Sequence, residues 1–118
     1  MRLESKKYLY DILQAARNLV RFSDGKDLSH YEADALLRSA IERQFEIIGE
    51  ALRRLAKEDA ATAARIAEYE RIISFRNILI HGYAEIDDRI VWDILQSKLP
   101  TLLRDVESLL DNGSDDSR

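Results

Sequence analysis

Apolar residues recur every three or four positions along most of the chain, and this spacing limits the fold more than any other feature. In residues 5–23 they lie on one helix face, at Leu9, Ile12, Leu13, Ala16, Leu19 and Val20. Only 4 Gly and 1 Pro interrupt the 118 residues, and the abundant Leu, Ala, Glu and Arg favour helix. The sequence therefore predicts an all-α protein, an up-and-down bundle of four to five helices.

Glycines and capping residues suggest where the first two helices begin and end. Gly25 follows the first helix, as glycine commonly does just past a helix end. Ser29 and Glu32 have the spacing of a capping box, which predicts the start of a second, long helix. Gly49 lies in the middle of that helix, where it costs about 1 kcal/mol relative to alanine. We expect it there because another helix approaches closely, either within the chain or across a dimer.

The sequence pattern after residue 58 predicts a loop followed by two further helices. Residues 58–67 are Ala-rich and weakly patterned, which suggests a loop with a short helical turn. A third helix is expected over residues 68–81, and a fourth from about Asp87 or Asp88. Pro100 should kink or break this fourth helix, because it removes a backbone donor and crowds the preceding turn.

The length of 118 residues fits one domain. We assign residues 1–111 to a single helical domain. Residues 112–118 are rich in Asn, Gly, Ser and Asp, and we expect them to form a disordered tail.

Composition excludes several functional classes. The chain has no Cys and two widely separated His residues, so it offers no disulfide and no metal-ligand cluster, and we expect neither a metal nor a cofactor. The charged start lacks the apolar stretch of a signal peptide, and no run approaches the roughly 18 apolar residues of a membrane span. These features predict a cytoplasmic protein. The net charge of −4 argues against bulk affinity for nucleic acid, so any RNA chemistry requires a few well-placed cations.

Polar side chains interrupt the otherwise apolar third helix, in Arg76-Asn77-Ile78-Leu79-Ile80-His81-Gly82-Tyr83. Asn77 and His81 are four residues apart and thus neighbours on one face. Arg76 and His81 are about 140° apart around the helix axis, so they share a face only because Arg is long. Spacing alone leaves two interpretations open: a catalytic cluster, or a His that caps the helix end beside an Arg-Asn pair that satisfies carbonyls.

The motif Arg-Asn-x-x-x-His-x-Tyr at residues 76–83 resembles the R-x4-H-x-Y signature of HEPN-domain proteins of the HepT group. Those proteins are the toxins of MNT–HepT (type VII) toxin–antitoxin modules. Further segments are similar in order: Gln44–Ala51 to E-I-I-G-E-A, Gly82–Asp87 to G-Y-x-x-I-D, Val91-Trp92 to V-W and Leu99-Pro100 to L-P. The resemblance covers residues 5–110.

Two positions depart from the group's pattern. Tyr69 occupies a position where Trp, preceded by Pro, is common, and Ser74 stands where Gly is common. Both concern local packing and leave the Arg-Asn-His-Tyr set intact.

The resemblance implies a metal-independent endoribonuclease, with Arg76 and His81 as catalytic residues and Asn77 and Tyr83 in support. The residue types suit this chemistry, because an imidazole can exchange protons near neutral pH and a guanidinium stabilises phosphate charge. One His cannot be base and acid at once. A homodimer, which is typical of HEPN proteins, would bring two Arg-His sets into one interface cleft.

The resemblance also implies a partner. In MNT–HepT modules a nucleotidyltransferase antitoxin transfers AMP from ATP to the motif tyrosine, here Tyr83. The added phosphate beside Arg76 and His81 would compete with RNA.

Other charged or aromatic residues have weaker functional interpretations. Arg43, Arg53 and Arg54, with Arg38 and Lys57, are candidate RNA-binding residues, although most of these fit a solvated helix face interleaved with glutamates better. Glu46 or Glu50 is expected to hold Arg76 by a salt bridge. We expect Trp92 to lie in the core and His30 to be structural.

Two alternatives to an enzyme remain at this point. The domain could be a non-catalytic module that presents a nucleotide or substrate to a nucleotidyltransferase, or a structural helical adaptor. Both would leave RNA uncut by the purified protein.

Overall fold

The structure is a computed structural model, and it describes residues 1–82 and 86–116, with side chains up to residue 111. Six helices occupy these residues: α1 (Leu3–Ser23), α2 (Leu28–Ala33), α3 (Ala35–Glu58), α4 (Ala60–Ala63), α5 (Tyr69–His81) and α6 (Asp88–Asp116). The described parts contain no strand, which confirms the all-α prediction. None of the helices found there is both long and apolar enough to cross a membrane.

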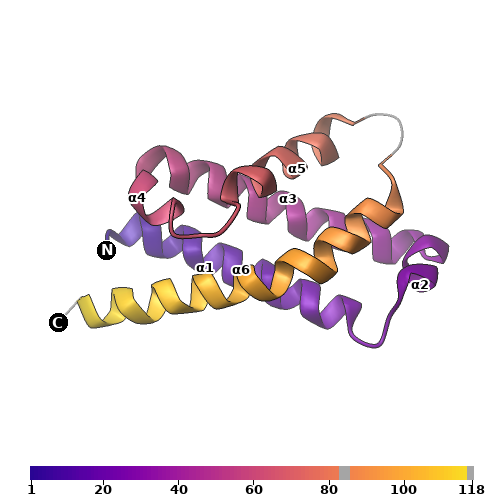
Figure 1. Cartoon of the computed structure of the whole chain (residues 1–118), viewed down its shortest axis with the longest axis horizontal. Coiled ribbons are helices and arrows are strands. Elements are labelled where there is room, and N and C mark those ends of the chain that lie inside the picture. Colours follow the sequence, from indigo (N-terminus) through magenta and orange to yellow (C-terminus); the bar gives the residue numbers. More distant parts are fainter. Residues whose placement is uncertain (83–85, 117–118) are drawn as a thin grey trace.

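Helix α3 is the central element. It packs against α1 on one side and α5 on the other, while α6 crosses α1 (Figure 1). The molecule measures 49 × 29 × 19 Å, so its shortest dimension is about two helix diameters. The apolar faces predicted for the long helices meet in this core, where Ile12, Ile48 and Val106 are fully buried.

The second predicted helix is divided in two, which corrects the expected start at Ser29. Asp27 caps α2 in a capping box with His30: the His30 backbone N–H donates to Asp27 Oδ1 (3.0 Å), and the Asp27 N–H donates to His30 Nδ1 (3.1 Å). Asp34 then interrupts the helix and caps α3 by accepting from the backbone N–H of Leu36. Two aspartates thus supply the caps, because a carboxylate satisfies the free N–H groups of a first turn. His30 is structural, as expected.

The break at Asp34 between α2 and α3 changes how this part of the chain packs. Helix α2 turns toward α6, where Tyr31 is completely buried and its ring lies 5.5 Å from that of Trp92. Trp92 is only 9% exposed, which confirms it as a core residue. In the described residues the bundle therefore consists of four longer helices, α1, α3, α5 and α6, and two short ones. The short helices are α2 and α4, and α4 is the helical turn that residues 58–67 suggested.

The sequence predicted that Pro100 would kink or break the helix; α6 is not broken at Pro100 but continues through it. Pro100 and Gln96, whose carbonyl loses its helical donor, are both exposed, so water can satisfy that carbonyl. Leu99, Leu102 and Val106 are buried on the opposite side and hold the helix against the core on both sides of the proline. The helical backbone of α6 reaches Asp116, beyond residue 112 where we expected a disordered tail to begin.

Candidate active site

Helix α5 carries the polar motif and is anchored by its apolar face. Ile72, Phe75 and Leu79 are buried, and the Phe75 ring meets the Phe45 ring of α3 edge-to-face at 5.1 Å. The helix ends at His81, as expected, and Gly82 is its C-cap. This packing directs Arg76 toward α3.

Gly49 makes the contact between α3 and α5 possible. A Cβ atom built at Gly49 would lie 2.2 Å from Arg76 Cβ and 2.5 Å from Arg76 Cγ. Real carbon atoms do not approach this closely, so no larger residue fits without a shift of one helix. The expected close approach is confirmed, and the helix that approaches is the one that carries the motif.

Arg76 is held by contacts to both helices. One terminal nitrogen, Nη2, lies 3.2 Å from Glu50 Oε1, and the other, Nη1, donates to Asn77 Oδ1 at 3.0 Å. Its side chain is only 20% exposed, and its Nε is buried with no hydrogen-bond partner among the residues that the structure describes. The guanidinium is therefore fixed in orientation, and Glu50 rather than Glu46 is its acidic partner.

Glu50 binds two further guanidinium groups. Arg53 donates to both of its carboxylate oxygens, at 2.9 and 3.0 Å, and Arg54 Nε donates to Oε2 at 3.2 Å. The two hydrogen bonds from Arg53, and then the one from Arg54, hold the pKa of Glu50 down at about 2. Glu50 thus stays ionised at any physiological pH, and three guanidinium groups surround one negative charge.

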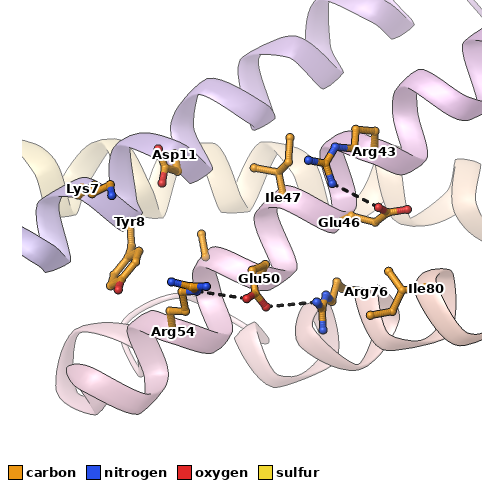
Figure 2. A pocket seen from close by; sticks show the side chains of 11 residues that line it. Lys7, Tyr8, Asp11, Arg43, Glu46, Ile47, Glu50, Arg54, Arg76 and Ile80 are labelled. Carbon is orange, nitrogen blue, oxygen red and sulfur yellow. Dashed lines mark hydrogen bonds and ion pairs between the residues drawn. The ribbon is translucent and has the colours of Figure 1, made fainter.

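A pocket of about 360 Å³ opens beside this cluster, between α1, α3 and α5. Figure 2 shows Lys7, Tyr8 and Asp11 of α1 facing Arg76 and Ile80 of α5 across α3. Arg43 and Arg54 also line the pocket, and Arg43 pairs with Glu46 at 3.5 Å. The pocket carries four cationic side chains and three carboxylates, on a chain with a net charge of −4.

The structure brings together only part of the predicted set. Arg76 and Asn77 are in contact, whereas His81 is exposed, does not line the pocket and has no side-chain hydrogen bond within the described residues. Tyr83 lies outside the described residues. Asn77 therefore orients Arg76 rather than the His81 ring.

The candidate RNA-binding arginines differ in position. Arg43 and Arg54 line the pocket, while Arg53 supports Glu50 without lining it. Arg38 donates to the carbonyl oxygens of Tyr31 and Glu32 and so has a structural role.

Sequence reasoning missed the contribution of α1 to the pocket. Lys7, Tyr8 and Asp11 occupy the polar side of a helix whose apolar face dominated the pattern. A Lys-Tyr pair beside an apolar stripe is common on solvated helices, so only the packing of α1 on α3 reveals the pocket.

An all-α bundle whose Arg-x4-His helix packs on a glycine of the central helix, beside a cationic pocket, defines a HEPN-like helical protein. The chain belongs to the HepT-like ribonuclease family, whose family model matches residues 12–109.

Individual relatives agree with this assignment. The chain is 32% identical over 102 residues to "Putative RNase MJ1380" of Methanocaldococcus jannaschii, a match that covers 86% of this chain and 93% of the relative. It is 31% identical over 105 residues to "Putative RNase TTE0752" of Caldanaerobacter subterraneus subsp. tengcongensis (89% and 93% covered). It is 28% identical over 109 residues to "Probable ribonuclease HepT" of Thermococcus cleftensis (92% and 98% covered). No solved structure matches the chain significantly.

Proposed function

We propose that this protein is a metal-independent endoribonuclease and the toxin of a toxin–antitoxin pair, with Arg76 and His81 as its catalytic residues. The observation that carries the proposal is the fixed Arg76 guanidinium at the edge of a cationic pocket, in a member of the HepT-like ribonuclease family. A guanidinium held in place before the substrate binds stabilises developing phosphate charge without reorganising.

The reaction starts when the 2′-hydroxyl of RNA loses a proton and attacks the adjacent phosphorus. The bond to the 5′-oxygen then breaks, and this oxygen gains a proton, which leaves a 2′,3′-cyclic phosphate. His81 is exposed at the end of α5, and an imidazole is the side chain that most often transfers such protons as a general acid or base. Arg76, oriented by Glu50 and Asn77, neutralises the charge on the phosphate oxygens.

The test is cleavage of RNA by the purified protein in the presence of a chelator. We expect fragments that end in a 2′,3′-cyclic phosphate, and no cleavage of a matching strand with 2′-deoxyribose throughout, because that strand lacks the nucleophile. The Arg76→Ala variant, prepared in parallel, controls for contaminating nuclease. If the wild-type protein cuts no RNA, or Arg76→Ala cuts as fast, the proposal is wrong.

The active unit in this proposal is a homodimer formed around the end of α5. His81 does not meet Arg76 within one chain, and Ile78 and Ile80 are 57% and 37% exposed beside it. Exposed apolar side chains on one helix next to catalytic groups suit an interface between two copies. Two such sets in one cleft would supply both a proton acceptor and a proton donor.

Ile78→Asp is expected to dissociate the dimer and to lower cleavage with it. An unpaired carboxylate in an interface costs several kcal/mol, so the dissociation constant should rise at least about 100-fold. Sedimentation equilibrium and RNA cleavage at the same protein concentration measure the effect. Val20→Asp, on an exposed apolar residue of α1, is the matched control. A monomeric Ile78→Asp variant that cleaves at the wild-type rate would contradict the dimer.

The partner in this proposal is a nucleotidyltransferase antitoxin that silences the toxin through Tyr83. The resemblance of the Arg-x4-His-x-Tyr motif supports this. The tyrosine hydroxyl loses its proton and attacks the α-phosphate of ATP, pyrophosphate leaves, and the new AMP adds a negatively charged phosphate that competes with RNA.

Tyr83→Phe is expected to escape this silencing, because it lacks the accepting oxygen. Intact-protein mass spectrometry after incubation with the partner and ATP should show AMP on the wild-type chain and none on the variant. AMP on Tyr83→Phe at the wild-type yield would place the modification on another residue, for which Tyr69 and Tyr8 are the first candidates to map.

A further inference from the structure

The pocket beside Arg76 receives side chains from α1, about seventy positions earlier in the chain than the motif. Lys7, Tyr8 and Asp11 line one wall, and Arg54 and Arg76 line the other (Figure 2). The volume of about 360 Å³ lies within the range of roughly 300–1,000 Å³ typical of small-molecule sites. This space is therefore large enough for a ligand that also reaches Arg76.

The charges around the pocket favour an anion. Arg43 is paired with Glu46, and Glu50 is shared among three arginines, so the guanidinium groups retain an excess of positive charge. Lys7 has no ion pair within the part of the chain that the structure describes. Asp11, one helical turn from Lys7, likewise forms no ion pair there, and it would repel an anion, as would the Glu58 carboxylate that accepts from the Tyr8 hydroxyl.

Tyr8 adds an aromatic surface. Its hydroxyl donates to Glu58 Oε2 at 2.6 Å, and the Arg54 guanidinium lies beside it, so the ring is fixed at the edge of the pocket. A fixed ring next to phosphate-binding cations is the usual arrangement for single-stranded nucleic acid, in which bases stack on aromatic side chains.

We propose that this pocket is a subsite for single-stranded RNA that binds a nucleotide neighbouring the scissile phosphate. Its phosphate lies between Lys7 and Arg54, and its base stacks on Tyr8. The proposal rests on the ribonuclease function, since Arg76 belongs to both the reacting site and the pocket wall. Helix α1 thereby contributes to RNA binding, which neither the motif nor the family assignment indicates.

Binding of an uncleavable RNA isolates this subsite from the chemistry. The probe is a fluorescein-labelled octamer of 2′-O-methyluridylate, measured by fluorescence anisotropy with the wild-type protein at several KCl concentrations. Lys7→Ala should weaken binding at low salt and reduce the slope of log K against log [salt] by about 0.7, as expected for one lost phosphate contact. Tyr8→Leu should weaken binding about tenfold, with little change in that slope.

Asp11→Asn should act in the opposite direction and tighten binding, because it removes the repelling charge. Arg17→Ala and Tyr10→Leu are matched controls on the same helix, since both side chains are exposed and neither lines the pocket. With unmodified RNA, the Lys7 and Tyr8 variants should raise KM and leave kcat unchanged.

The experiments distinguish a failure of the proposed subsite from a failure of the proposed ribonuclease function. If wild type cuts RNA but the Lys7, Tyr8 and Asp11 variants bind the octamer like the Arg17 and Tyr10 controls, the subsite is wrong and the ribonuclease stands. A loss of kcat without a change in KM would also overturn the subsite. If wild type neither binds the octamer nor cuts RNA, the proposed function itself is wrong.

Discussion

Replacing His81 by alanine is expected to lower the rate of RNA cleavage by about 10²–10⁴-fold, the range for loss of a general acid or base. His81 is exposed at the end of α5 and has no side-chain hydrogen bond within the described residues. Its removal should therefore leave the fold intact. Single-turnover cleavage of RNA by the purified variant, with circular dichroism as the check on folding, measures the effect.

The other histidine of the chain is the matched control. His30 belongs to the capping box of α2 and takes no part in the proposed chemistry. His30→Ala should slightly lower the melting temperature and leave the rate of cleavage unchanged. His81→Ala should leave the melting temperature unchanged and lower the rate of cleavage. If the two variants cleave RNA equally well, His81 is not catalytic, and the alternative of a His that only terminates the helix gains support.

Replacing Gly49 by alanine is expected to destabilise the protein by about 2 kcal/mol. Overpacking costs typically 1–3 kcal/mol and here lies at the upper end, because the contact is 2.2 Å from Cβ to Cβ and not with the end of a flexible side chain. Alanine recovers about 1 kcal/mol of helix propensity, which offsets part of this. Urea unfolding at a fixed protein concentration measures the difference.

Activity should fall in the same variant, because the helix that carries Arg76 must move away from α3. A displaced Arg76 can no longer keep its 3.2 Å contact with Glu50. Cleavage is therefore expected to decrease even under conditions in which the variant is fully folded.

A double-mutant cycle identifies the cause. The clash involves Arg76 Cβ, which Arg76→Ala retains and Arg76→Gly removes. Gly49→Ala should therefore remain destabilising in the Arg76→Ala protein and become stabilising in the Arg76→Gly protein. If Gly49→Ala stabilises the otherwise wild-type chain by about 1 kcal/mol, as an unconstrained helical glycine would, the close contact does not exist in solution.

Much of the fold follows from local sequence. The apolar period placed α1, α5 and the start of α6 within a few residues, because an amphipathic helix is recognisable without its partners. The errors lie where two local signals compete. Ser29 and Asp27 both suit a cap, and the burial of Tyr31 against Trp92 goes with the cap at Asp27.

At Pro100 the local sequence favours a break that does not occur, because tertiary packing overrides it. The local effect of Pro100 opposes a helix, yet α6 continues because the proline faces solvent while its neighbours are buried. Whether a residue faces solvent or the core depends on how the helices pack in the bundle. The sequence around Pro100 therefore does not show that the proline faces solvent.

The sequence by itself determined the helical class and the need for a close helix contact at Gly49, since each depends on residue type and spacing along one helix; the Arg-Asn-His-Tyr set stays a prediction from the family resemblance. Only the tertiary structure decided that Arg76 is the residue against Gly49, that Glu50 holds it, and that Lys7 and Tyr8 lie across from it. Contacts between residues tens of positions apart depend on how helices pack, and helical periodicity reports only which face is apolar, not which partner it meets.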